Sequence, residues 1–97
     1  MIQTFADEGT CDIYVGTDSK AARRALPKPL WSVARRKLHW IDAAASVDAL
    51  RMPPGNRLEA LKGDRAGTCS VRINDRYRIT FRFEEGNAYE VRCEDYH

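Results

Sequence analysis

An alternation of apolar and polar side chains with a period of two runs through the C-terminal half of the chain and constrains the fold most. Between positions 76 and 83, aromatic and aliphatic residues alternate with arginines and a threonine, which is typical of a strand with one buried face. Asn74-Asp75 and Glu85-Gly86-Asn87 interrupt the pattern and are typical turn residues. The sequence therefore predicts an antiparallel sheet, with strands at 57–62, 69–73, 76–83 and 88–93.

The N-terminal half has the spacing of helices. Apolar residues recur every three or four positions from about residue 28 to residue 45, which predicts a helix with one apolar stripe. One or two helical turns are expected at 10–15, ended by Gly16. We also expect a short strand at 1–5 and a further turn at 47–50, before 53–55 end the helical structure. The predicted fold class is α+β, with N-terminal helices packed on one face of the sheet.

The register of the sheet follows from matching the apolar faces, because a slip of one residue turns every apolar side chain to the wrong face. Across the first turn, this matching places Arg72 opposite Arg78. Across the second turn it places Arg82 opposite Glu90. The other predicted pairs are Ile73 with Tyr77, Val71 with Ile79, Phe83 with Tyr89, Phe81 with Val91 and Arg78 with Glu94.

The length and composition fit one small domain over residues 1–97. Its mass is 11.1 kDa and its apolar share is 43%, enough for a modest core. We find no apolar run near the ~20 residues of a membrane span and no signal-peptide pattern at the start. The three cysteines have no C-x-x-C spacing and are read as reduced thiols. We therefore expect a cytoplasmic protein that does not bind a membrane.

Charge is unevenly distributed, although the net charge is only +2. Seven basic residues and no acidic one lie in 20–37, and eight basic residues against three acidic ones lie in 51–82. The last fifteen residues reverse this, with five acidic residues and one arginine. Twelve of the sixteen basic residues are arginines, whose planar guanidinium suits bidentate contact with phosphate. Solvated surface charge explains the same composition.

The facing arginines Arg72 and Arg78 are the feature of the register that points to a ligand. Like charges directly opposite are destabilising, and Glu94 is at best shared between them. The pair is interpreted either as an anion site on the polar face of the sheet or as two solvated arginines held apart.

Two more segments carry chemical groups. The terminal Asp95-Tyr96-His97 offers a carboxylate, a phenol and an imidazole for proton transfer, and the register places Tyr96 beside Arg76. A frayed terminus is the alternative interpretation. The basic segment 62–65 is either a plain turn or a phosphate-binding loop without a Walker pattern. Two histidines and scattered acidic residues give no metal-ligand pattern, so neither metal nor cofactor is expected.

The residues from Arg57 onwards resemble the HigB-type killer toxins of plasmid-maintenance systems, in the RelE/ParE superfamily. The resemblance rests on L-K-G-D-R at 61–65, S-V-R-I-N-D at 70–75, Y-R-I-T-F-R-F at 77–83, E-G-N-A-Y at 85–89 and the terminal D-Y-H. It implies a RelE-like fold and a toxin of a type II toxin–antitoxin system that cuts mRNA on the translating ribosome. Departures from the family pattern lie at Glu59, Cys69 and Asn74.

The resemblance also implies the functional residues. Its catalytic positions fall on Lys62, Arg78, Asp95, Tyr96 and His97. Since RNA supplies its own 2′-hydroxyl nucleophile, the expected reaction needs no metal. The cations would hold the phosphate, the tail would move protons, and Tyr96 would contact a base. Further RNA or phosphate contacts are predicted at Arg72 and Arg76 from the register, and at Arg65, Arg35 and Arg36 within the basic segments.

The partners implied by the resemblance are the ribosome with its mRNA and a cognate helix-turn-helix antitoxin. Operator DNA would be contacted only through the complex with the antitoxin. Two alternatives stay open: a gyrase-poisoning toxin of the ParE kind without nuclease activity, or a degenerate, non-catalytic relative that binds its antitoxin.

Overall fold

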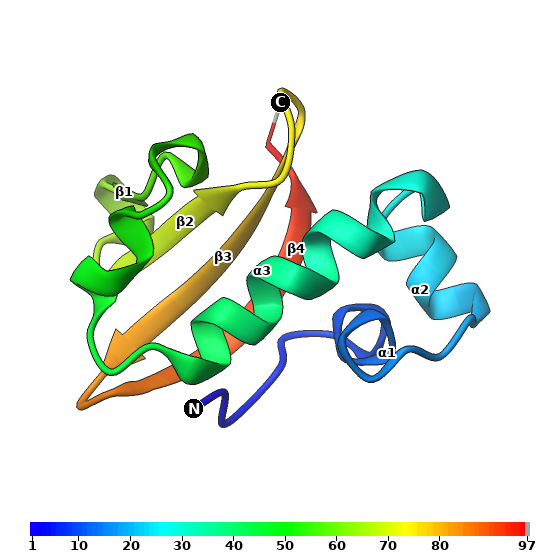
Figure 1. Cartoon of the computed structure of the whole chain (residues 1–97), viewed down its shortest axis with the longest axis horizontal. Helices are drawn as coiled ribbons and strands as arrows, with labels where there is room; N and C mark the ends of the chain where they lie inside the picture. Colours follow the sequence, from blue (N-terminus) through cyan, green and yellow to red (C-terminus); the bar gives the residue numbers. More distant parts are fainter. Residues whose placement is uncertain (97) are drawn as a thin grey trace.

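The computed structural model describes residues 1–96 and consists of N-terminal helices packed against a four-stranded antiparallel sheet (Figure 1). Helices α1 (Glu8–Val15) and α2 (Lys20–Ala25) pack on each other, and α3 (Trp31–Ala43) lies across the sheet. The strands β1 (Glu59–Ala60), β2 (Thr68–Arg72), β3 (Tyr77–Glu84) and β4 (Asn87–Asp95) are neighbours in chain order. The expected α+β class is therefore confirmed. Short 3₁₀ turns occupy Lys28–Leu30, Val47–Arg51, Pro54–Asn56 and Gly63–Arg65.

Local sequence signals account for the ends of the first two helices. The Asp7 carboxylate accepts a hydrogen bond from the Thr10 backbone N–H at the start of α1, and the Ser19 hydroxyl does the same for Ala22 in α2. Gly16 ends α1 with φ 90°, a left-handed conformation in which glycine carries no Cβ penalty. The predicted helical segment at 10–15 and its stop at Gly16 are confirmed.

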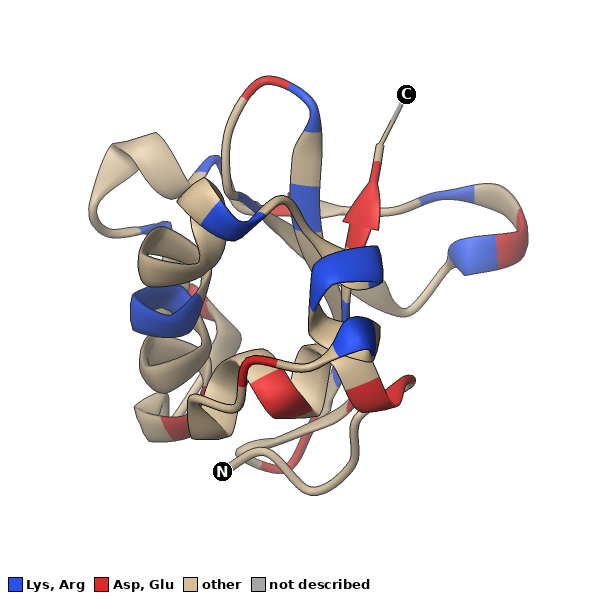
Figure 2. Cartoon of the chain, turned by 90° about the vertical axis from the view of Figure 1, so that its right-hand side faces the viewer, with Lys and Arg blue, Asp and Glu red and all other residues tan. Residues whose placement is uncertain are grey.

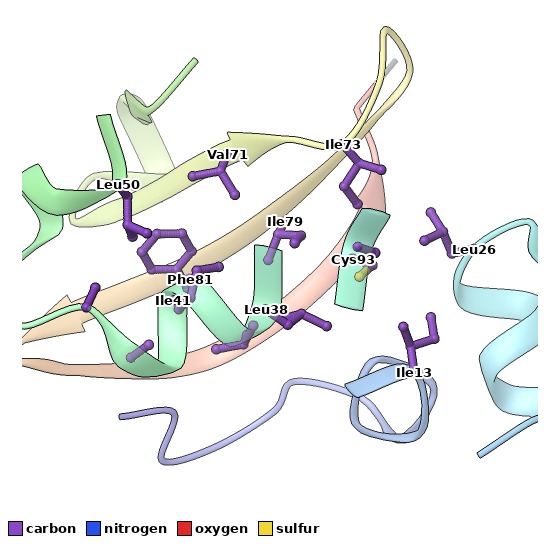
Figure 3. Packing of buried hydrophobic residues seen from close by; sticks show 14 of the residues in the cluster. Ile13, Leu26, Leu38, Ile41, Leu50, Val71, Ile73, Ile79, Phe81 and Cys93 are labelled. Atoms are coloured by element: carbon purple, nitrogen blue, oxygen red, sulfur yellow. The ribbon is translucent and has the colours of Figure 1, made fainter. Parts of the chain in front are cut away.

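The apolar stripe of α3 packs on the sheet and forms the core. Ala34, Leu38 and Ile41 are fully buried against residues of β2, β3 and β4 (Figure 3). The helix is shorter than the predicted 28–45, because Pro29 limits its start to a 3₁₀ turn and the backbone at Ala44 is extended. The core is completed by Ile73 in the turn after β2 and by the strand residues Val71, Ile79, Phe81, Ala88, Val91 and Cys93.

The first hairpin of the sheet has the predicted register. Val71 pairs with Ile79, and Arg72 pairs with Arg78. The Asn74 side chain closes the turn by accepting hydrogen bonds from the backbone N–H groups of Arg76 and Tyr77, as an Asx turn does. The face of the sheet opposite α3, called the open face below, thus carries Ser70, Arg72, Arg78, Thr80 and Glu94.

The second hairpin corrects the predicted register next to its turn. Arg82 pairs with Tyr89 and Phe83 with Ala88, one residue away from the predicted pairs of Arg82 with Glu90 and Phe83 with Tyr89. A β-bulge explains the shift: Glu90 adopts φ 55° and is the extra residue of β4. Beyond the bulge the predicted register returns, and Arg78 pairs with Glu94.

Two predicted strands are shorter than expected. Residues 1–5 form only isolated bridges to β4, at Ile2 and Phe5, and at the bulge the Glu90 N–H donates to the Thr4 hydroxyl instead of a backbone carbonyl. In the predicted strand 57–62, the regular strand is limited to β1: Arg57 before it is left-handed with φ 45°, and after it the Leu61 N–H still donates to the Thr68 carbonyl. Within residues 1–96, no helix is long and apolar enough to cross a membrane.

Candidate active site

Arg78 is the central cation of the open face. Its residue is only 7% exposed, and its Nε donates a hydrogen bond of 2.8 Å to the Ser70 hydroxyl. Its Nη2 donates to the backbone carbonyls of Arg57 and Ser70. Every one of these acceptors is neutral, and no carboxylate of residues 1–96 forms an ion pair with Arg78. The positive charge is therefore fixed in orientation without being neutralised.

The two cations nearest to Arg78 in the register form ion pairs with acidic neighbours. The Arg72 guanidinium pairs with Asp75 in the turn. The Arg76 guanidinium pairs with Asp95 at 2.7 Å. The open face thus keeps the facing arginines predicted from the sequence, but only one of the two, Arg78, lacks an acidic partner among the described residues.

Glu94 forms an ion pair with neither of the facing arginines, which is within the expectation that it is at best shared between them. Its carboxylate accepts a bidentate contact from Arg65, at 2.7 and 3.0 Å, and a hydrogen bond of 2.8 Å from the Thr80 hydroxyl. The hydrogen bonds from Arg65 hold the pKa of Glu94 below its usual value, against the opposing effect of burial. This contact anchors the turn Gly63–Arg65 to β4 on the open face.

Lys62 lies at the start of the same turn and is exposed. Its ammonium has no hydrogen bond or ion pair with another described residue. The Arg65–Glu94 contact holds this turn against β4, so Lys62 is an exposed cation without a described partner on a turn anchored to the sheet. Of the two predicted basic residues in this segment, Arg65 forms an ion pair with Glu94, and the role of Lys62 stays a prediction.

The end of the chain approaches the same face. The Tyr96 backbone N–H donates to the Arg76 carbonyl at 2.8 Å, as expected from the register. The Tyr96 ring lies under the Arg78 guanidinium, with 5.3 Å between Cζ and the ring centroid, a cation–π distance. Figure 2 shows the acidic end of β4 beside basic segments of the neighbouring strand and turn. His97 lies outside the described residues.

Within the described residues, Lys37 is the only basic residue of α3 with a hydrogen bond to this cluster. Arg35 and Arg36 are exposed, and the Arg36 guanidinium lies over the Trp40 ring. Lys37 is only 8% exposed and donates a hydrogen bond to the Arg72 carbonyl. Burial lowers the pKa of Lys37, as do the positive charges of Arg72, Arg36 and Arg78. Lys37 is therefore not the solvated phosphate contact that its place in the basic segment 20–37 suggests.

A groove of about 560 Å³ lies beside the site, between the segment 4–6 and residues of β2, β3 and β4. Hydroxyl groups of Thr68 and Thr80 line it, together with Arg65, Arg82 and Arg92. These arginines also contact acidic residues, as Arg82 does with Glu84 at 3.0 Å. The lining also includes Glu90 and the rings of Phe5 and Phe81, and Arg78 lies outside it.

Three residues at this site were not selected from the sequence. Ser70 could have been found, because the alternation puts it on the same face as Arg72. Lys37 also had a signal, since its spacing from Ala34 and Ile41 is that of the buried stripe. The role of the Arg57 carbonyl has no signal in the side-chain pattern. Within residues 1–96, no group of three histidine, cysteine or acidic side chains could hold a metal ion.

Comparisons with known proteins agree on one family. The family model described as RelE-like toxin of type II toxin-antitoxin system HigB matches residues 3–97. The chain is 43% identical over 88 residues to Toxin HigB-1 of Vibrio cholerae, covering 91% of this chain and 90% of that protein. It is 41% identical over 97 residues to Endoribonuclease HigB of Proteus vulgaris, covering 100% of both.

Solved structures share the fold at low sequence identity. A chain of the YoeB-YefM complex from Staphylococcus aureus superposes with a TM-score of 0.62 at 18% identity, covering 100% of this chain and 98% of that chain. A YoeB/ParE toxin from Agrobacterium tumefaciens superposes with a TM-score of 0.56 at 18% identity, covering 98% and 99%. These structural similarities confirm the expected RelE-like fold.

Proposed function

Because this chain belongs to the HigB family of RelE-like toxins of type II toxin–antitoxin systems, we propose that it is an endoribonuclease that cuts mRNA on the translating ribosome. The name of the Proteus vulgaris relative, which aligns over the full length of both chains, supports the nuclease activity. The structural observation that supports it most is Arg78, a cation oriented by neutral acceptors on the open face.

The chemistry requires a preorganised positive charge. When the 2′-hydroxyl of RNA attacks the adjacent phosphate, negative charge accumulates on the phosphorane-like transition state. A fixed cation stabilises that charge without reorganising during the reaction. Arg78 and the exposed Lys62 are assigned to the phosphate in this proposal, and Arg72 is assigned to assist them.

The chain terminus supplies the groups for proton transfer and base contact. Asp95 or His97 removes the 2′-hydroxyl proton or protonates the leaving 5′-oxygen, and Tyr96 stacks on or orients a base. Asp95 is positioned by its ion pair with Arg76. If the variant carrying both Lys62→Ala and His97→Ala cleaves mRNA at the wild-type rate, this assignment is wrong.

The remaining basic residues are assigned to binding. Arg65 and Arg76 hold the turn and the tail next to the reacting phosphate, while Arg35 and Arg36 contact ribosomal RNA from α3. Phosphate contacts of this kind release counterions, so ribosome binding weakens as salt rises. We also propose a cognate helix-turn-helix antitoxin as partner, contact with operator DNA only through that complex, and action in the bacterial cytoplasm.

The activity is tested with a defined mRNA in a bacterial translation extract, read by primer extension. The proposal predicts cuts that require both the protein and ribosomes engaged in translation. A gyrase supercoiling assay is run in parallel. Inhibited supercoiling without RNA cuts would replace the nuclease with a gyrase poison, and growth without arrest on expression would indicate a non-catalytic relative.

A further inference from the structure

The Arg78 guanidinium is held by a buried cradle whose side chains take no part in the proposed reaction. Ser70 is fully buried in β2, between β1 and β3. Its hydroxyl accepts from Arg78 Nε at 2.8 Å, and its backbone carbonyl accepts from Nη2 at 3.3 Å. Ser70 alone thus accepts hydrogen bonds from two nitrogens of the guanidinium.

The third contact comes from the loop before β1. The Arg57 carbonyl accepts from Arg78 Nη2, and Arg57 is left-handed with φ 45° and ψ 57°. The preceding Asn56 is 1% exposed, and its Nδ2 donates to the carbonyls of Leu50 at 3.2 Å and Met52 at 3.4 Å. The buried amide therefore fixes the loop that presents the Arg57 carbonyl.

The neutrality of the acceptors distinguishes this cradle from an ordinary ion pair. A carboxylate in place of the Ser70 hydroxyl would orient Arg78 equally well, but it would cancel the charge that a phosphate needs. A hydroxyl and two carbonyls orient the guanidinium and leave its charge intact. Removing the hydroxyl leaves the buried Nε–H unpaired, which drives the guanidinium to another orientation.

We propose that Ser70 is a positioning residue that acts through Arg78: its hydroxyl fixes the guanidinium in the orientation that the transition-state phosphate requires. This inference rests on the proposed nuclease activity. A misplacement of about 1 Å can cost on the order of a hundredfold in rate. We accordingly expect Ser70→Ala to slow cleavage by about tenfold to a hundredfold while ribosome binding is unchanged.

The test is a double-mutant cycle. Single-turnover cleavage on programmed ribosomes, at saturating protein, is measured for the wild type, Ser70→Ala, Arg78→Ala and the double variant. If Ser70 acts through Arg78, then Ser70→Ala has almost no effect in the Arg78→Ala background. Equal losses in both backgrounds, or a single variant that cleaves as fast as the wild type, would overturn the proposal.

Matched variants separate positioning from general loss of structure. Ser46→Ala removes an exposed hydroxyl that makes no capping hydrogen bond, and it should cleave like the wild type. Ser70→Thr keeps the hydroxyl and should retain more activity than Ser70→Ala. Rates are compared below the melting temperature of the least stable variant. If folded Ser70→Thr and Ser70→Ala lose the same activity, the hydroxyl is not the cause.

A second readout does not depend on cleavage. Nitrogen-15 NMR should show a slowly exchanging Nε–H signal that disappears in Arg78→Ala and exchanges faster in Ser70→Ala. Unchanged exchange in Ser70→Ala contradicts the cradle. If the wild type cuts no RNA but this protection is present and depends on Ser70, the orientation of Arg78 stands and the proposed function fails.

Discussion

Glu94→Gln tests the contact that anchors the turn Gly63–Arg65 to the open face. The Glu94 side chain is 13% exposed and receives two hydrogen bonds from Arg65 and one from Thr80. An amide can still accept from Thr80, but its NH₂ group faces a guanidinium donor. Hydrogen bonds to charged groups contribute about 1.5–3 kcal/mol. Because Arg65 is nearly half exposed, the expected loss in unfolding free energy is about 1–2 kcal/mol.

Thermal unfolding followed by circular dichroism measures this loss. For a domain of this size, about 1 kcal/mol shifts Tm by roughly 4–8 °C, so a decrease of roughly 5–15 °C is expected at pH 7.

The pKa of Glu94 is lowered in the folded state. The contribution of the Glu94 carboxylate to stability is therefore complete above the unfolded pKa and is lost as pH falls through the folded pKa. The difference between the two proteins should therefore shrink from pH 7 to pH 3. Glu84→Gln, at an exposed carboxylate, is the control, and an equal Tm for Glu94→Gln and wild type at pH 7 would refute the reasoning.

Three further predictions follow from single positions. Lys62→Ala removes an exposed cation that has no partner among residues 1–96, so Tm should change by less than about 2 °C while single-turnover mRNA cleavage falls about a hundredfold; a large loss of stability would show a structural role instead. Glu90→Gly relieves the left-handed conformation at the bulge and should raise the unfolding free energy in urea by about 0.5–1 kcal/mol, whereas a decrease would show that the side chain matters more than the backbone. Burial raises the pKa of the Cys93 thiol to about 12, so alkylation at pH 8 should modify Cys93 in urea but not in the native protein, and rapid native labelling detected by peptide mass spectrometry would contradict its burial.

The alternation of apolar and polar side chains was sufficient to predict most of the sheet. It fixed the register of the first hairpin and the pairing of Arg78 with Glu94. It could not reveal the bulge, because the left-handed residue there is Glu90 and not the glycine that usually marks such a position. The late start of the strand expected at 57–62 has the same origin, since the left-handed Arg57 carries no glycine signal either.

The positions of the candidate site residues along the strands could be predicted from the register of the sheet. The contacts of their side chains were harder to predict, because they depend on the direction in which each side chain points. Placing Tyr96 beside Arg76 needed only the strand pairing. Which acid each arginine contacts depends on rotamers and on the turns, so the contact of Glu94 with Arg65 could not be read from the pattern. The backbone acceptor at Arg57 lies outside any side-chain pattern.

The most direct test of the account compares wild type and Arg78→Ala on purified ribosomes programmed with one mRNA. Single-turnover cleavage and ribosome binding are measured on the same preparations, with folding verified by thermal unfolding. Loss of one preorganised charge contact typically costs about 10²–10³ in rate. The account predicts cleavage by the wild type and a loss of about this size in the variant, with binding retained. Equal cleavage rates, or no cleavage by the folded wild-type protein, would contradict it.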